Sequence, residues 1–274
     1  MHFRDCRGAV PPAPVYLATA MLLSAAWAAG GAERVKILFN VPAGVESYSG
    51  LQPVTFGVPF ERGKLKKTDG LRVVDGRGNR VTAQFDVTAT WAPASDEVRW
   101  LLVDLLVPIE DGKTPDCYLE FGADVPKTES APANRPDLND PMFGPRQSVL
   151  VDGQGKRYGP KDVETALERV GPVRSVVKVT GKYVSENGRW IADFVTRYRL
   201  YGNVPFVRVY HTMIWQTDAA TEIGSLTFNP AQRLAGGEAT AGLDRKRVGP
   251  AKSLVLSQTD WNVVTGAARG KHLD

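Results

Sequence analysis

Short runs of alternating apolar and polar residues make up most of this chain from about residue 33 onward. The clearest run is 207–215, in which Val207 and Val209 alternate with Arg208 and Tyr210. A period of two sends successive side chains to opposite faces of a β-strand, whereas an amphipathic helix needs a period near 3.6 residues. Because few long stretches show the helical period, the pattern predicts an all-β fold.

Residues 33–126 are predicted to form a small N-terminal β-barrel domain. Between two apolar runs, Asp75-Gly76-Arg77-Gly78 is a turn signal for a β-hairpin. About six short strands suit a closed barrel, since closure leaves no unpaired sheet edge. The expected strands are 35–39, 54–60, 72–74, 80–91, 98–107 and 116–122.

A second domain is predicted over 144–274, after a linker at 127–143. The linker contains three prolines and little apolar bulk, so it cannot form a core of its own. Asn187-Gly188 is the strongest hairpin turn signal in the chain. We expect a hairpin at 149–158, one short helix at 162–169, and antiparallel strands at 172–185, 189–201, 205–216 and 221–229.

These strands predict a large antiparallel sheet that forms part of a β-sandwich. Such a sheet needs a second layer to cover its apolar face. The residues after 230 are few and rich in loop-forming types, so we expect the sandwich to be incomplete and the chain to be truncated.

The first 28 residues have the layout of an export signal. Arg4 and Arg7 precede an apolar run at 15–26, and Ala26-Trp27-Ala28 offers a small-residue cleavage site. The run is shorter than the roughly 20 residues that a membrane span needs. We therefore expect a signal peptide at 1–28 and a secreted, periplasmic or extracellular mature protein that has no membrane association after cleavage.

The cysteine content indicates that the mature chain has no internal disulfide, and the charge argues against nucleic-acid binding. Loss of Cys6 with the signal peptide would leave Cys117 alone, so no internal disulfide is expected, and its apolar strand setting indicates a buried residue. The formal net charge is only +4. The basic clusters at 64–67 and 245–247 lack the density and the aromatic residues typical of nucleic-acid binding. They are either solvated loop surfaces or contacts for an acidic polysaccharide.

No motif for a catalytic nucleophile, a phosphate loop or a cofactor occurs in the chain. Asp137, Asn139 and Asp140 offer oxygen ligands, but they lack the glycine and the distal glutamate of a calcium loop, so no metal site is expected. His2 lies in the signal and His272 at the end of the chain. His211 is therefore the one candidate imidazole acid or base.

His211 has two open interpretations. Alternation places it on one strand face with Trp215. There it is either a core histidine with both ring nitrogens bonded, or a cleft-facing acid or base beside an aromatic sugar platform. Arg208 and Tyr210 share the other face and complete the set of catalytic candidates.

Asp193, Arg197 and Arg199 share one face of the neighbouring predicted strand. They form either an exposed salt-bridged surface or, if Arg208 and Tyr210 lie opposite them, a patch that holds a uronate carboxylate. Arginine suits that role because it matches a carboxylate with two parallel hydrogen bonds. The candidate substrate-binding residues are Asp193, Arg197, Arg199 and Trp215.

Four segments together resemble the exo-rhamnogalacturonan lyase/YetA-like (PcRGLX/YetA-like) family. They are 52–63, 98–104 with its Val98-Arg99-Trp100, 171–179, and 207–212. The resemblance implies an N-terminal RIFT barrel followed by a central β-sandwich. Residues 92–97 replace the family's usual Asp-Gly-Ser-type turn, and nothing in the chain resembles the family's C-terminal α/α toroid.

The family's chemistry, as the resemblance implies it, is β-elimination on an acidic pectic glycan such as rhamnogalacturonan. A base removes the proton next to a uronate carboxylate, and an acid assists the leaving oxygen. Without its helical partner domain, this carbohydrate-active chain is expected to be inactive. Two alternatives stay open: a complete, non-catalytic carbohydrate-binding or cell-surface protein, and a glycoside hydrolase with Asp193 and Asp104 as paired carboxylates.

Overall fold

The structure is a computed structural model of the chain. The residues that it describes are 32–41, 48–67, 69–126, 132–144, 148–204, 207–217, 221–228, 239–243, 246–251, 255–258 and 270–273. The predicted signal peptide at 1–28, with Cys6, lies outside the described residues. Within these ranges, no helix has the length and apolar character needed to cross a membrane.

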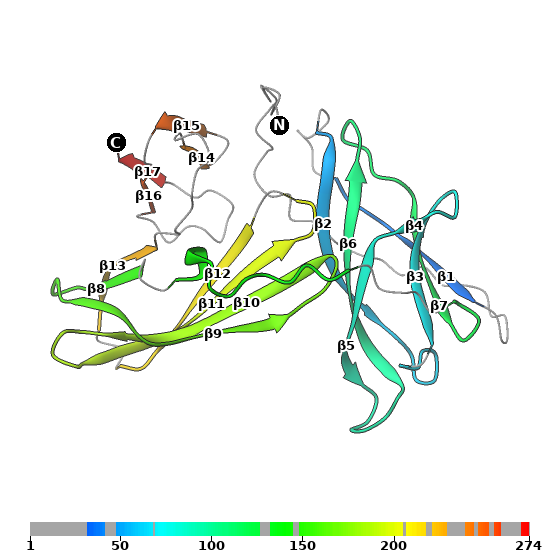
Figure 1. Ribbon diagram of the computed structural model, residues 1–274, viewed down its shortest axis with the longest axis horizontal. Helices are drawn as coiled ribbons and strands as arrows, with labels where there is room; N and C mark the ends of the chain where they lie inside the picture. Colours follow the sequence, from blue (N-terminus) through cyan, green and yellow to red (C-terminus); the bar gives the residue numbers. More distant parts are fainter. Residues whose placement is uncertain are drawn as a thin grey trace.

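The N-terminal domain consists of antiparallel strands in two sheets (Figure 1). One sheet has the order β1-β7-β3-β4, and the other has the order β2-β6-β5. The strands are β1 (Glu33–Ile37), β2 (Gly50–Pro59), β3 (Gly70–Asp75), β4 (Arg80–Val81), β5 (Ala83–Thr90), β6 (Val98–Ile109) and β7 (Cys117–Gly122).

Strand β6 is the central strand of the smaller sheet. Its residues Leu101, Val103 and Leu105 are completely buried and point into the core between the two sheets. The thiol of Cys117 lies in the same core, as its strand setting predicted, and burial raises the pKa of this thiol to about 11. The alternate residues of β6 therefore point to the outer face of the smaller sheet.

The second domain is built on a six-stranded antiparallel sheet in the order β12-β11-β10-β9-β8-β13. A short 3-10 helix, η1 (Pro141–Phe143), precedes it. The strands are β8 (Ser148–Asp152), β9 (Arg157–Arg169), β10 (Arg174–Val184), β11 (Trp190–Tyr201), β12 (Val207–Trp215) and β13 (Ile223–Phe228). Two further hairpins pair β14 (Ala239–Leu243) with β15 (Lys246–Ala251) and β16 (Val255–Gln258) with β17 (Gly270–Leu273).

The all-β prediction is confirmed, but the predicted helix at 162–169 is wrong. These residues belong to strand β9, where half-buried Val163 and Leu167 alternate with exposed Glu164 and Glu168. Two apolar residues four positions apart fit both a helix and a strand, so their spacing alone did not separate the two. Pairing with β10 along most of its length makes the segment a strand.

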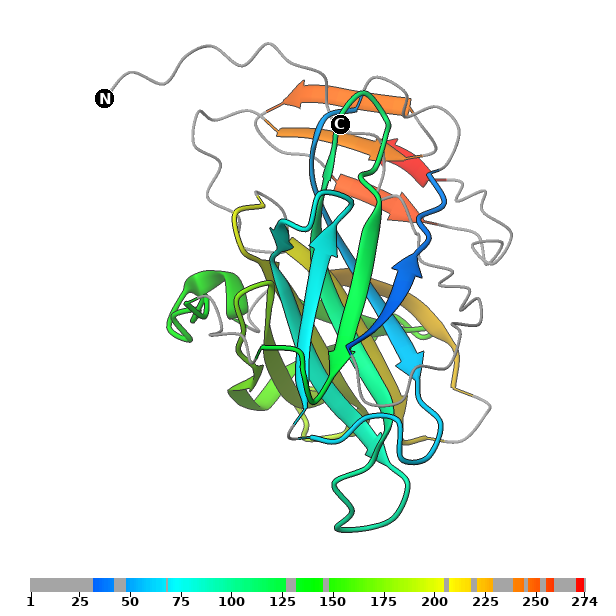
Figure 2. The same ribbon diagram turned by 90° about the vertical axis from the view of Figure 1, so that its right-hand side faces the viewer.

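The six-stranded sheet has an apolar inner face and a polar outer face. Val177, Tyr183 and Phe194 point inward, and Phe143 of η1 belongs to the same buried cluster, with its ring centroid 5.2 Å from that of Tyr198. In Figure 1 the short helix lies above the sheet. In Figure 2 the N-terminal domain stands in front of this sheet. The opposite face of β9–β12, which we call the outer face, carries five of the candidate site residues: Asp193, Arg197, Arg199, Arg208 and Tyr210.

Candidate functional site

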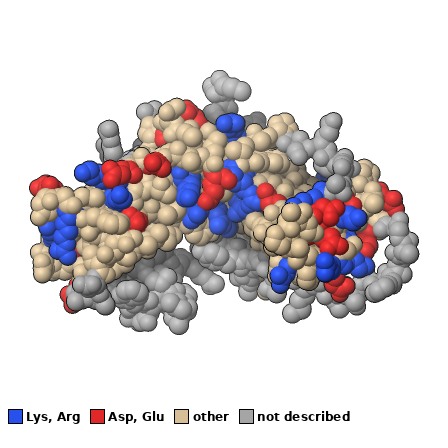
Figure 3. All heavy atoms as spheres, turned by 90° about the horizontal axis from the view of Figure 1, so that it is seen from below, with Lys and Arg blue, Asp and Glu red and all other residues tan. Residues whose placement is uncertain are grey.

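Three arginines lie in one row across the outer face. Arg199 of β11 pairs with Arg208 of β12 on one side and with Val176 of β10 on the other, and Val176 pairs with Arg169 of β9. Neighbouring strands are about 4.8 Å apart, so the row spans about 14 Å. We call Arg169, Arg199 and Arg208 the arginine row. Figure 3 looks at the molecule from below and shows basic side chains gathered near the middle of the view.

A second row lies next to the arginine row. Arg197 pairs with Lys178 on one side and with Tyr210 on the other. Glu168 accepts two hydrogen bonds from Arg197, at 2.7 and 2.9 Å, and the guanidinium lowers the pKa of this carboxyl group. Arg197 is therefore occupied by a partner, whereas Tyr210 remains 40% exposed.

Aromatic rings lie against two arginines of the row. The guanidinium of Arg199 lies 4.3 Å from the centroid of the Tyr210 ring, and that of Arg208 lies 5.7 Å from the centroid of the Tyr201 ring. Among the described residues, Arg199 forms no ion pair. A guanidinium that is oriented by a ring and still carries its full charge suits bidentate contact with a carboxylate.

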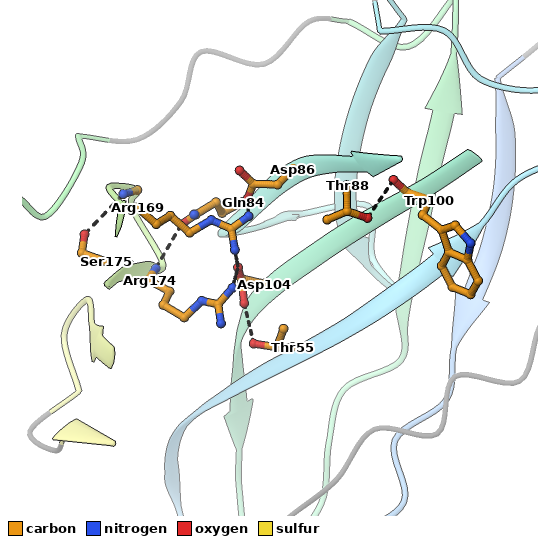
Figure 4. A network of polar contacts seen from close by, with 10 residues as sticks. Thr55, Gln84, Asp86, Thr88, Trp100, Asp104, Arg169, Arg174 and Ser175 are labelled. Carbon is orange, nitrogen blue, oxygen red and sulfur yellow. Dashed lines mark hydrogen bonds and ion pairs between the residues drawn. The ribbon is translucent and has the colours of Figure 1, made fainter. Parts of the chain in front are cut away.

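The arginine row ends at the contact between the two domains (Figure 4). Arg169 forms ion pairs with Asp86 of β5 and with Asp104 of β6. Asp104 is completely buried, although it lies on the outer face of its sheet, because the second domain covers it. Its carboxylate also accepts hydrogen bonds from Thr55 and, at 3.0 Å, from Arg174.

Arg174 joins the two domains by its side chain and by its backbone. Its guanidinium meets Asp104, and its amide N–H donates to the side chain of Gln84 at 3.0 Å. Burial lowers the pKa of Arg174, while the Asp104 carboxylate opposes that shift. This ion pair is therefore structural: it fixes the outer face of the second domain against β5 and β6.

His211 lies on the inner face, away from the arginine row. Its Nε2 is 3.0 Å from the Tyr183 hydroxyl, its Nδ1 is 2.7 Å from the Thr196 hydroxyl, and its ring stacks on Phe194. Burial lowers the pKa of the imidazole below its ordinary value of 6.5. The structure therefore does not bring the three catalytic candidates together, because Arg208 and Tyr210 point to the opposite face.

The remaining candidates also lie on different faces. Trp215 packs against the inner core. Asp193 lies on the outer face, farther from the domain contact, and accepts hydrogen bonds from Trp190 and Gln216 at 3.1 and 2.8 Å. Asp104 belongs to the domain contact, so it and Asp193 are positioned by different domains.

Sequence reasoning overlooked the residues that connect the site to the N-terminal domain. Arg169 fell in the predicted helix, Gln84 and Arg174 were read only as strand residues, and Asp104 was considered only as a carboxylate paired with Asp193. A buried position for Asp104 was suggested by one signal alone, an aspartate within the most apolar strand of the chain.

The described residues contain no cluster of three or more His, Cys, Asp or Glu side chains suited to a metal ion. The linker acids have local roles instead. Asp137 accepts hydrogen bonds from the backbone and side chain of Asn139, and Asp140 caps η1 through the amide of Met142.

The structure defines an all-β protein built from two sets of antiparallel sheets. Residues 44–102 match the PcRGLX-like N-terminal RIFT barrel domain. Residues 156–234 match the PcRGLX-like protein central beta sandwich domain. The two matches together span about half of the chain, in the order predicted from the sequence, and the chain belongs to the PcRGLX-like family.

Among solved structures, the chain is similar to an alpha-mannosidase from Enterococcus faecalis V583, at 12% identity and a TM-score of 0.33. The similarity covers 61% of this chain and 28% of that chain. No curated protein matches the sequence.

Proposed function

We propose that this chain is the exported, N-terminal accessory part of a polysaccharide-lyase-like protein that acts on acidic pectic glycans such as rhamnogalacturonan. Its outer face binds the uronate groups of the glycan, and the chain alone has no lyase activity. The observation that carries the proposal is the arginine row, in which Arg199 and Arg208 are held on tyrosine rings beside the exposed Tyr210.

The chemistry of the row suits an acidic sugar chain. A uronate presents a planar carboxylate, which a guanidinium grips through two parallel hydrogen bonds. Tyr210 lies against the guanidinium of Arg199 and is still 40% exposed, so part of its side chain is accessible to a sugar next to that charge. Because Arg199 and Arg208 lie on neighbouring strands, the two guanidinium groups would engage more than one acidic group of a polymer.

The non-catalytic alternative has its own support. The one candidate imidazole, His211, is bonded at both ring nitrogens on the inner face. A proton-transfer group must come within hydrogen-bond reach of the substrate, and His211 is separated from the outer face by the sheet. This placement favours a binding role for the chain over a role in the chemical step.

Binding of polygalacturonate and of a neutral glycan to the full chain, measured by isothermal titration calorimetry, tests the proposal. We expect binding of the acidic polymer that weakens with salt, because charged contacts are screened. The double variant R199A/R208A should bind the acidic polymer about tenfold more weakly than the wild type, or weaker still. R62A, which removes an arginine with a 73% exposed side chain from the N-terminal domain, should bind as the wild type does.

A parallel assay on rhamnogalacturonan follows the ultraviolet absorbance of the unsaturated product. We expect no turnover by the full chain. Robust turnover would refute the accessory role, and equal binding by R199A/R208A and the wild type would refute the role of the row.

A further inference from the structure

Three tryptophans among the described residues are strongly exposed: Trp91 at 38%, Trp100 at 42% and Trp190 at 42%. An exposed indole presents a large apolar ring, and the face of that ring attracts positively polarised C–H groups. Sugar rings carry such groups on their faces. The surroundings of each tryptophan decide whether its ring is accessible to a sugar.

Two of the three rings already have partners. Trp91 donates its indole N–H to the carbonyl of Phe60 at 3.2 Å, and the guanidinium of Arg99 lies 5.2 Å from its ring. Trp190 donates to Asp193 at 3.1 Å, and the ammonium of Lys182 lies 5.3 Å from its ring.

Trp100 differs from both of them. Within the described part of the chain, its indole N–H makes no hydrogen bond and no cation lies over its ring. A Cβ placed on Gly57 of β2 would lie 3.4 Å from Cζ3 of Trp100, so the indole lies against the bare backbone of the neighbouring strand (Figure 4). The six-membered ring of the indole therefore packs beside Gly57, and the residue as a whole is 42% exposed.

Trp100 also lies on the same sheet face as the residues that hold the end of the arginine row. It shares the outer face of β6 with Leu102 and Asp104, which are two and four residues away. Leu102 pairs with Asp86, and Asp86 holds Arg169 of the row. Two residues along a strand correspond to about 7 Å, so the backbone of Trp100 lies about 7 Å from that of Leu102 and about 14 Å from that of Asp104, where the arginine row meets the N-terminal domain.

We propose that Trp100 is a stacking platform for a sugar ring of the glycan whose acidic groups bind the arginine row. The bound chain then crosses from the sandwich sheet to the outer face of β6, with a pyranose ring on the indole and a sugar hydroxyl accepting the indole N–H. This inference rests on the proposed function and adds to it a second contact, in the other domain, that recognises the apolar face of the sugar rather than its charge.

Calorimetric titration of the full chain with a short and a long rhamnogalacturonan oligosaccharide tests the platform. A long oligosaccharide can contact the arginine row and Trp100 together, whereas a disaccharide cannot reach both. We expect W100A to weaken binding of the long oligosaccharide by about tenfold. In W100A, the affinities for the long and the short oligosaccharide should differ less than they do in the wild type.

Two variants separate stacking from structure. W190A removes an equally exposed tryptophan from the sandwich domain and should bind the long oligosaccharide as the wild type does. W100L still covers Gly57 with apolar atoms but lacks a flat ring, so it should fold like the wild type and lose the same affinity as W100A.

Each outcome bears on the proposal. Wild-type affinity in W100A or W100L, or an equal loss in W190A, would overturn the platform and leave the arginine row intact. Failure of the wild type to bind any acidic oligosaccharide would overturn both the row and the platform.

Discussion

At the scale of single residues, His211 shows how the two faces of one strand acquire different roles. Its ring is enclosed by Tyr183, Thr196 and Phe194, whereas its neighbour Tyr210 is exposed on the other side of the sheet. Alternation predicted that the two residues lie on opposite faces, and it left open whether His211 faces the core or a cleft. The hydrogen bonds to both ring nitrogens show that it faces the core.

The environment of His211 predicts a pH dependence of stability. Its pKa is lowered in the folded state by burial, so between 6.5 and that lowered value the unfolded chain binds a proton that the folded chain does not. The stabilisation that neutral His211 contributes to the free energy of unfolding is fully present above pH 6.5 and is lost as the pH falls through this window. Urea unfolding of the wild type and of H211Q at a series of pH values measures this pH-dependent stabilisation.

H211Q should cost about 1–3 kcal/mol at neutral pH, because it disturbs two hydrogen bonds in the core. The wild type should lose part of this advantage as the pH falls below 6.5. A difference between the two proteins that stays constant from pH 8 to pH 5 would contradict a buried, neutral imidazole.

At the scale of elements, the hairpin between β10 and β11 depends on one backbone conformation. Gly188 has a φ of 82°, in the left-handed region that residues with a Cβ avoid. The sequence Asn187-Gly188 predicted this turn. The turn fixes the register that pairs Lys178 with Arg197 and Val176 with Arg199, so it helps to align the arginine row.

G188A should destabilise the protein by about 1–2 kcal/mol, since a Cβ is unfavourable in the left-handed region. G159A is the matched control. Gly159 lies in strand β9 without a positive φ, and a Cβ there meets no heavy atom within 4 Å. Denaturant unfolding of both variants measures the difference, and equal stabilities would contradict the role of the turn.

At the scale of the whole molecule, a buried ion pair joins the two domains. Asp104 and Arg174 have side chains that are 1% and 5% exposed, and they are separated by 70 positions in the sequence. Breaking a buried pair leaves one charge without compensation in a medium that solvates it poorly. The contact also fixes Arg169, so it links the stability of the molecule to the position of the arginine row.

D104N should therefore cost about 3–5 kcal/mol in unfolding free energy. E168Q removes a carboxylate from a half-exposed pair with Arg197 and should cost less than about 1 kcal/mol. Chemical denaturation followed by circular dichroism compares them. A D104N variant as stable as E168Q would mean that the domain contact does not depend on this charge.

The sequence by itself determined the strands and the faces to which their residues belong. The alternating pattern located β10, β11, β12 and β13. It also placed His211 and Tyr210 on opposite faces of their strand, because successive side chains in a strand point to opposite sides. The same pattern misassigned 162–169, where apolar spacing fits two structures.

Only the tertiary structure decided which face is covered and which residues meet across strands and domains. The arginine row depends on the register of four strands, and the burial of Asp104 depends on Arg174 in another domain. Trp100 and Gly57 meet through the pairing of β2 with β6. Local periodicity carries no information about such long-range pairs, because they form only when distant segments pack together.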